Sequence, residues 1–169
     1  MRKLSFLLAI GIAGLLTACN NGGGQSATTK KNIEVSNAIS KAYEAGDFSK
    51  MGDYIAADAV DHGGETGDIK GLENIVAEMK RYRAMMPDMK SSNTVSLGND
   101  DYVFTRATVT GTMNGKQINM TSIDVSRFKD GKAVEHWVYM DPKEMMEMMQ
   151  DMPPPPASVN PADTATNKK

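Results

Sequence analysis

The second half of the chain alternates apolar and polar residues over four consecutive segments, and this pattern constrains the fold most strongly. The four segments are residues 91–98, 101–113, 116–128 and 132–140. They are rich in Val, Ile, Thr, Tyr and Phe, which is typical of β-strands. Asn114-Gly115 and Asp130-Gly131 separate the last three segments, and both pairs favour tight two-residue hairpins. The pattern therefore predicts an antiparallel meander.

Helical patterns precede the meander. Val35, Ala38, Ile39 and Ala42 recur at the spacing of one helix face, and Gly46 suits the end of that helix. The expected helices are residues 32–45, 48–55 and 72–86, with a last short helix that begins at Asp141-Pro142. Residues 57–70 are expected to be irregular. Helices followed by an antiparallel meander indicate an α+β domain with its helices packed on one face of the sheet.

Both ends of the chain are expected to lie outside this domain. Arg2 and Lys3 precede a short apolar run, which is typical of a secretion signal over residues 1–18. Leu16-Thr17-Ala18-Cys19 looks like a bacterial lipobox, in which the cysteine is lipidated after cleavage. We expect a flexible tether over residues 19–31, a folded domain over residues 32–152 and a disordered proline-rich tail over residues 153–169.

Composition excludes several classes of function. The chain has 19 Lys and Arg against 21 Asp and Glu, and it lacks the basic stripe of a nucleic-acid-binding protein. Its single cysteine excludes an internal disulfide framework and a cysteine-cluster metal site. The two histidines, His62 and His136, are too far apart in sequence for a zinc signature. We expect no metal and no cofactor.

Fourteen methionines are unusual for 169 residues, and several end the domain. Met145, Met148, Met149 and Met152 recur at helical spacing, which places their sulfur atoms on one helix face. Such a face can pack on the sheet or form a pliable lid over a pocket. The alternative is a copper(I) site, because thioethers are soft ligands.

The order of elements and several motifs resemble the SnoaL-like polyketide cyclases of the nuclear transport factor 2-like superfamily, over residues 32–150. The early landmarks are Asp58-Ala59-Val60-Asp61-His62 after a helix that ends at Tyr54-Ile55, and Gly71-Leu72-Glu73-Asn74-Ile75 at the start of the third helix. The most specific stretch is Arg127-Phe128-Lys129-Asp130-Gly131-Lys132-Ala133-Val134-Glu135-His136-Trp137.

This resemblance implies a curved antiparallel sheet wrapped around helices into a cone, with a pocket at the open end. It also implies a homodimer through the outer face of the sheet, where Trp137 and Tyr139 would lie. Two family positions differ in this sequence. The cyclases carry their general acid/base Asp where Val138 stands, and a pocket His where Asp124 stands.

Two residues remain candidates for acid–base chemistry. Asp124, between Ser122 and Ser126 on an expected strand, is a candidate general base, and the alternative is a solvated carboxylate on the sheet. His136 is a candidate proton shuttle or hydrogen-bonded core histidine. Whether the two share a face depends on the hairpin register. A two-residue loop pairs Asp124 with Trp137, and a bulge shifts this pairing by one residue.

The candidate ligand-binding residues are those expected to line the cone: Tyr54, Asp61, His62, Met120, Ser122 and Val138. The sequence thus predicts a lipoprotein of the bacterial cell envelope that is anchored in a membrane through Cys19. We expect it in the outer membrane or facing the periplasm. Its domain is expected to bind a small, largely apolar molecule. The alternatives are a cofactor-free isomerase, dehydratase or cyclase that uses Asp124, and an interaction module with a vestigial pocket.

Overall fold

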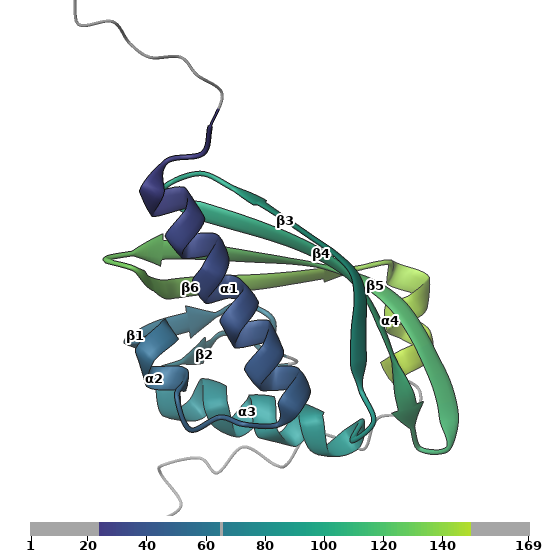
Figure 1. Cartoon of the computed structure of the whole chain (residues 1–169). Coiled ribbons are helices and arrows are strands. Elements are labelled where there is room, and N and C mark those ends of the chain that lie inside the picture. The colour runs from purple at the N-terminus through teal and green to yellow at the C-terminus, as the bar shows by residue number, and fades with distance from the viewer. Residues whose placement is uncertain (1–23, 65, 150–169) are drawn as a thin grey trace, which may run out of the picture.

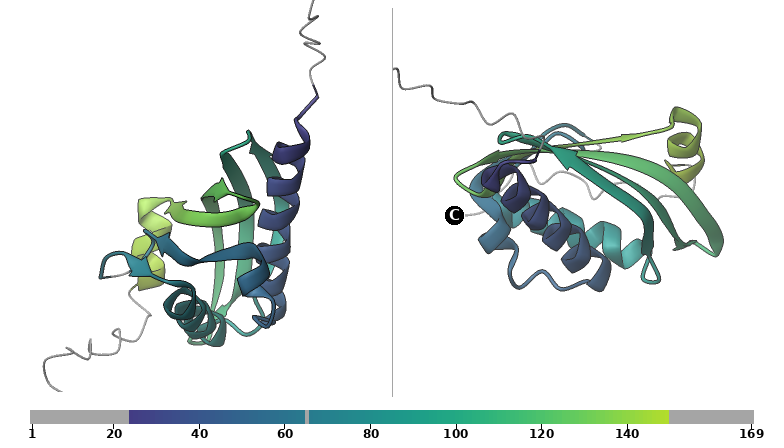
Figure 2. Two further views of the ribbon diagram at one scale, coloured as in Figure 1. Left: turned by 90° about the vertical axis from the view of Figure 1, so that its left-hand side faces the viewer. Right: turned by 45° about the horizontal axis from the view of Figure 1, so that its top comes forward.

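A computed structural model describes residues 24–64 and 66–149. The helices are α1 (Ala27–Ala45), α2 (Met51–Tyr54), α3 (Leu72–Met85) and α4 (Pro142–Met149). The strands are β1 (Ile55–Asp61), β2 (Ile69–Lys70), β3 (Lys90–Gly98), β4 (Tyr102–Met113), β5 (Lys116–Lys129) and β6 (Lys132–Met140). The strands form one curved sheet in the order β2-β1-β6-β5-β4-β3, and α1 and α3 lie on its concave side (Figures 1 and 2). The expected α+β class is confirmed.

The meander follows the sequence pattern closely. β3 to β6 pair as antiparallel neighbours, within one residue of the expected bounds. Asn114 and Gly115, like Asp130 and Gly131, have positive φ angles, as a hairpin turn with the right-handed twist of the strands requires. The two turn signals therefore placed the hairpins correctly.

Two expectations in the first half of the chain were wrong. The helix predicted over residues 48–55 is one short turn, and the segment predicted to be irregular contains β1. β1 runs parallel to β6, with Asp61 opposite His136. Its sequence, Ile-Ala-Ala-Asp-Ala-Val-Asp, has little β propensity, so pairing with β6 determines the strand.

The first helix also begins earlier than predicted, because part of the expected tether belongs to it. Ser26 caps α1 by accepting a hydrogen bond from the backbone of Thr29 at 2.9 Å. The side chains of Ser26 and Thr29 both donate to Asp100, and the amide of Asn32 donates to the Asp100 carbonyl at 2.8 Å. These contacts fix the start of α1 to the β3–β4 turn. The remaining expected terminal segments, residues 1–23 and 150–169, lie outside the described residues.

The interior contains two packed clusters of apolar side chains. The larger cluster joins α1, α2, α3 and the sheet, and its buried members are Val35, Met51, Ile55, Ala59, Ile75, Val103, Phe128 and Ala133. The smaller one, here called the methionine cluster, consists of Met86, Met89 and Met113. The polar candidate residues of the inner sheet face belong to neither cluster.

The last helix lies at the far end of the sheet (Figure 2). Asp141 caps it as the sequence predicts, with its carboxylate accepting from the backbone of Lys143 at 2.8 Å. Glu144 of α4 accepts a hydrogen bond from the backbone of Thr121 at 3.1 Å, which ties the helix to β5. Among the described residues, no helix is long and apolar enough to cross a membrane.

Candidate functional site

A bulge in the last hairpin determines which side chains share the inner face of the sheet. Lys129 pairs with Lys132 across the turn, but the register shifts by one residue between Arg127 and Phe128. Beyond this bulge Asp124 lies opposite Val138, and Ser126 lies opposite His136. Cross-strand partners project from the same face, so Asp124 and His136 share the concave side. Of the two registers that the sequence left open, the structure has the shifted one.

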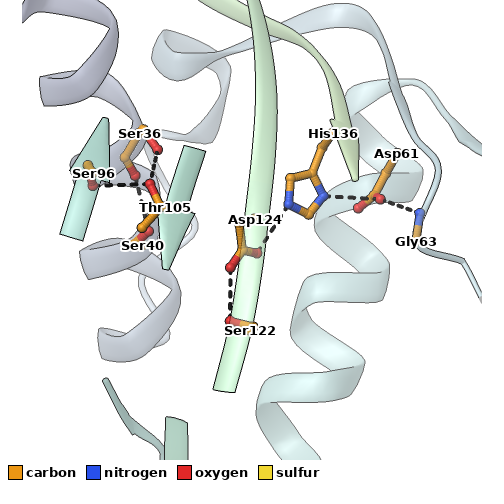
Figure 3. Close-up of polar contacts among 9 residues, drawn as sticks. All are labelled: Ser36, Ser40, Asp61, Gly63, Ser96, Thr105, Ser122, Asp124 and His136. Carbon is orange, nitrogen blue, oxygen red and sulfur yellow. Dashed lines mark hydrogen bonds and ion pairs between the residues drawn. The ribbon is translucent and has the colours of Figure 1, made fainter. Parts of the chain in front are cut away.

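Three side chains from three strands meet there in a chain of polar contacts, called the triad below (Figure 3). His136 on β6 contacts the carboxylate of Asp61 on β1 through Nδ1 at 3.1 Å and that of Asp124 on β5 through Nε2 at 3.3 Å. Parallel pairing of β1 with β6 places Asp61 directly beside His136. The strand that the sequence did not reveal therefore supplies one third of the site.

Both carboxylates of the triad have further partners. The backbone N–H of Gly63 donates to Asp61 Oδ1 at 2.8 Å, and the hydroxyl of Ser122 donates to Asp124 Oδ2 at 3.0 Å (Figure 3). A Cβ on Gly63 would lie 2.9 Å from Cγ1 of Val138, so glycine lets that loop close against the triad. These contacts fix the orientation of both carboxylates around the imidazole.

The electrostatics favour a charged imidazole. Burial disfavours the protonated form of His136, but hydrogen bonds and ion pairs with Asp124 and Asp61 outweigh it and raise its pKa to about 9. Burial also acts to raise the pKa of Asp61, but the hydrogen bond and charge of His136 outweigh that and lower it. At neutral pH the side chain of His136 is therefore an imidazolium that contacts both Asp61 and Asp124.

The triad is reachable from solvent through Asp124. About 39% of the Asp124 side chain is exposed, against 20% for Asp61. Asp124 can thus meet a bound molecule, whereas Asp61 lies behind His136. The arrangement can accept a proton at Asp124, hold a proton on His136 and orient both groups through Asp61.

Tyr43 on α1 is a residue that the sequence did not single out. Its ring packs against the methionine cluster and meets Phe48 edge to face. Burial raises the pKa of Tyr43 to about 12; Arg83 opposes this shift, and the negative charge of Asp124 adds to it. The hydroxyl therefore keeps its proton and lies within the electrostatic reach of Asp124. Its position in the helical apolar pattern was the available signal, but that pattern does not distinguish a core ring from a hydroxyl donor.

Three of the expected cone-lining residues accompany the triad. Ser122 donates to Asp124, Val138 lies opposite Asp124, and Met120 shares the inner parity of β5 and packs beside the methionine cluster. Tyr54 instead packs against the larger core cluster, which contains no member of the triad. A separate groove between α1 and β3 is lined mostly by polar residues, including Asn37, Lys41 and Thr94, and contains no triad residue.

His62 was expected to line the cone beside Asp61, and the structure places it on the opposite face. His62 directly follows the end of β1, and Trp137, which neighbours His136 on β6, points to the convex side. The two rings stack at 4.8 Å with an angle of 16° between their planes. Asp68 contacts Nδ1 of His62 at 2.9 Å. Within the described parts of the chain, no group of three or more His, Cys, Asp or Glu side chains is arranged to hold a metal ion.

Comparison with known proteins identifies the family. The family model of the SnoaL-like polyketide cyclases matches residues 33–151. The chain belongs to this family. No curated protein matches the sequence. The SnoaL-like domain shares its fold with NTF2-like proteins of known structure, as the curved sheet and its helices also indicate.

Solved structures extend the comparison to proteins of differing activity. IdmH of Streptomyces antibioticus, a candidate polyketide cyclase, is 27% identical, with 70% of this chain and 98% of that one covered and a TM-score of 0.59. A candidate SnoaL-like cyclase from Jannaschia is 15% identical, with 79% and 99% covered and a TM-score of 0.68. An LEH-like epoxide hydrolase from M. tuberculosis is 16% identical, with 73% of this chain and 92% of that one covered and a TM-score of 0.61.

Proposed function

We propose that the SnoaL-like domain binds a small, largely apolar molecule on its concave face, with a polar group of that molecule at the triad. The observation that carries this proposal is the accessible carboxylate of Asp124, held between Ser122 and His136 on that face. Val138 and Met120 provide apolar neighbours, and a flexible thioether adapts to varied ligand shapes. The family membership supports small-molecule binding.

Native mass spectrometry of the purified full chain tests this proposal. We expect a small-molecule mass on the folded protein that disappears on denaturation, and whose chemical analysis names the ligand class. Replacing Val138 with Asp would place a second carboxylate opposite Asp124 and should abolish that mass. Ala57→Asp, which adds a carboxylate at an exposed position of β1 outside the triad, is the control. A chain that carries no ligand and takes up none from a lipid and metabolite extract would contradict the proposal.

A second candidate function is acid–base catalysis by Asp124, as in a cofactor-free isomerase, dehydratase or cyclase. The family carries His at the position of Asp124 and Asp at the position of Val138. These two residues are cross-strand partners here, so the carboxylate of this chain lies on β5 instead of β6. The exposed carboxylate of Asp124 would take a proton from the bound substrate. His136 would stabilise the negative charge that this leaves on the substrate, and Tyr43 would donate a hydrogen bond to a substrate oxygen.

The two candidates predict different behaviour of Asp124→Asn. Catalysis requires turnover to fall by ~10²–10⁴, the usual contribution of a general base, while folding is retained. Asp58→Asn removes an exposed carboxylate of β1 and should leave turnover unchanged. A binding protein without catalysis would show no turnover in either variant, and retained turnover in Asp124→Asn would exclude this base.

We also propose that Cys19 carries a lipid that anchors the protein in the bacterial cell envelope. The support is the motif Leu16-Thr17-Ala18-Cys19 after a short apolar run, and these residues lie outside the described part of the chain. The variant Cys19→Ala should lose the acyl mass and leave the membrane fraction. Acyl chains that persist on this variant would disprove the assignment.

Finally, we propose a homodimer through the convex face of the sheet. That face carries an outer apolar patch, defined here as Val95, Leu97, Phe104, Ile123 and Tyr139, each between 43% and 63% exposed. Register pairs Leu97 with Phe104 and Ile123 with Tyr139, and the exposed Arg106 lies opposite both Val95 and Ile123. Exposed apolar side chains that gather on one face in this way typically mark an interface. The mass of the purified protein in solution tests this state.

A further inference from the structure

The methionine cluster lies apart from the triad and has an unusual composition. Met86, Met89 and Met113 are each at most 5% exposed. Five further side chains pack around them: Tyr43, Met85, Val109, Ile118 and Met120. Five of these eight residues are methionines, although Leu or Ile would fill the same space with equal apolar surface. The interior is thus rich in thioether sulfur at this one place.

Two separate segments bring these three methionine side chains together, and polar contacts fix the segments to each other. Met86 and Met89 lie in the connection between α3 and β3, and Met113 ends β4. Asp88, between the first two, accepts hydrogen bonds from the backbone and the hydroxyl of Thr112 at 2.7 and 2.8 Å. The connection is therefore clamped to the end of β4, directly beside Met113.

A glycine makes room for one of these thioethers. A Cβ on Gly111 would lie 2.5 Å from both Cγ and Sδ of Met86, so any larger residue would displace that sulfur. The Asp88 carboxylate lies 3.2 Å from the same point. The Met86 sulfur therefore occupies space that Gly111 of β4 leaves free.

From this convergence we propose that Met86, Met89 and Met113 form a binding site for a soft monovalent metal ion, copper(I) or silver(I). Thioethers are soft, uncharged ligands, and soft sulfur donors select copper(I) over the harder divalent ions. Methionine has three rotatable side-chain bonds, so buried sulfurs can turn toward an ion without backbone movement. Met85 and Met120, which are half-buried, offer further sulfur donors between the cluster and solvent. Met120 also belongs to the ligand-binding face proposed above, whereas Met86, Met89 and Met113 take no part in the function proposed for the triad.

Metal titration tests the site. The Cys19→Ala chain is used throughout, because this removes the single thiol, which would itself bind the metal. We expect the protein to bind one silver(I), or one copper(I) under anaerobic reducing conditions, and X-ray absorption to show sulfur ligands. Replacing Met86, Met89 and Met113 together with Leu should weaken binding by at least ~100-fold, and each single replacement by at least ~10-fold. Met→Leu exchange nearly conserves volume, so the fold should persist.

Two control variants separate this site from other methionines. Met51→Leu makes the same chemical change in the larger core cluster at the same burial and should leave affinity unchanged. Met145→Leu with Met148→Leu and Met149→Leu tests the helix α4, which the sequence alone had suggested as an alternative copper site. If the triple variant unfolds, the three single variants decide. Absence of stoichiometric binding, or affinity that falls with α4 variants but not with the cluster variants, would overturn the proposal.

Discussion

Each face of the sheet departs in one region from the usual distribution of polar and apolar side chains. On the concave face Thr105, Ser122 and Ser126 are buried, and the triad lies among them. On the convex face the outer apolar patch is about half exposed. Hydrophobic side chains usually lie inside and polar ones outside.

This difference indicates that the two faces have different roles. A buried hydroxyl or carboxylate costs free energy unless it is hydrogen-bonded, so the polar region of the concave face depends on its hydrogen bonds. The hydroxyls of Ser36, Ser96 and Thr105 satisfy one another there, at 3.1–3.3 Å (Figure 3). The convex face exposes apolar area that a second molecule can cover.

Two phenylalanines on opposite faces provide the largest expected contrast. Phe128 is 4% exposed in the larger core cluster, and Phe104 is 47% exposed in the outer apolar patch. Phe128→Ala should lower the free energy of unfolding by about 3–5 kcal/mol, because it opens a cavity in the core. Phe104→Ala should lower it by about 1 kcal/mol at concentrations where the protein is monomeric. Urea unfolding measures both, and equal losses would contradict the assigned faces.

The pH dependence of stability tests the concave face. Folding raises the pKa of His136 from 6.5 to about 9, so folding favours its protonated form. The resulting stabilisation is complete below pH 6.5 and is lost as the pH rises from 6.5 to about 9. Because a third of the side chain is exposed, we expect about 2 kcal/mol after screening. The difference in unfolding free energy between the parent and His136→Gln should shrink over this range, and a constant difference would exclude a charged His136.

A smaller effect is expected in the hydroxyl network. Thr105→Val keeps the shape of the side chain but removes the hydroxyl that Ser36 and Ser96 share. Unfolding free energy should fall by about 1–2 kcal/mol, because two neutral hydrogen bonds are lost. Thr108→Val, on the convex parity of the same strand, makes the identical change and should leave stability within about 0.5 kcal/mol. Thermal unfolding of the pair gives the comparison directly.

The smallest effect on the folded monomer is expected for Ile123→Ser and Tyr139→Ser in the outer apolar patch. Both side chains are about half exposed, so each substitution should change monomer stability by about 1 kcal/mol or less. The proposed dimer should nevertheless dissociate, because the two side chains are cross-strand partners and supply two of the five members of the patch. Analytical ultracentrifugation separates the two effects. A dimer that survives both substitutions would move the interface elsewhere.

Local patterns in the sequence predicted the meander well. Alternation set the strands, the two Asx-Gly pairs set the turns, and Asp141-Pro142 set the start of α4. Each of these signals acts over a few neighbouring residues, and none requires knowledge of the rest of the chain. The resemblance to the family then predicted that the sheet curves around the helices into a cone.

The assembly of the site depended on contacts between distant residues. β1 exists because it pairs with β6, so Asp61 could be named from the sequence but not placed against His136. The bulge near Phe128 shifts every later pair by one residue, and in the other register Asp124 would share a face with Trp137. His62 was assigned to the cone because the segment was taken as irregular, where neighbours need not alternate. These three outcomes depended on sheet pairing.

The early start of α1 limits how far the domain can move from a membrane. If Cys19 is the anchor, residues 20–25 are the complete connection to the Ser26 cap, and six residues span at most about 20 Å. Because α1 is fastened to the β3–β4 turn, that end of the molecule would face the lipid headgroups. The β4–β5 turn lies at the opposite end (Figure 1). The protein would thus stand on the bilayer in one preferred orientation, close enough for lipid composition to affect it.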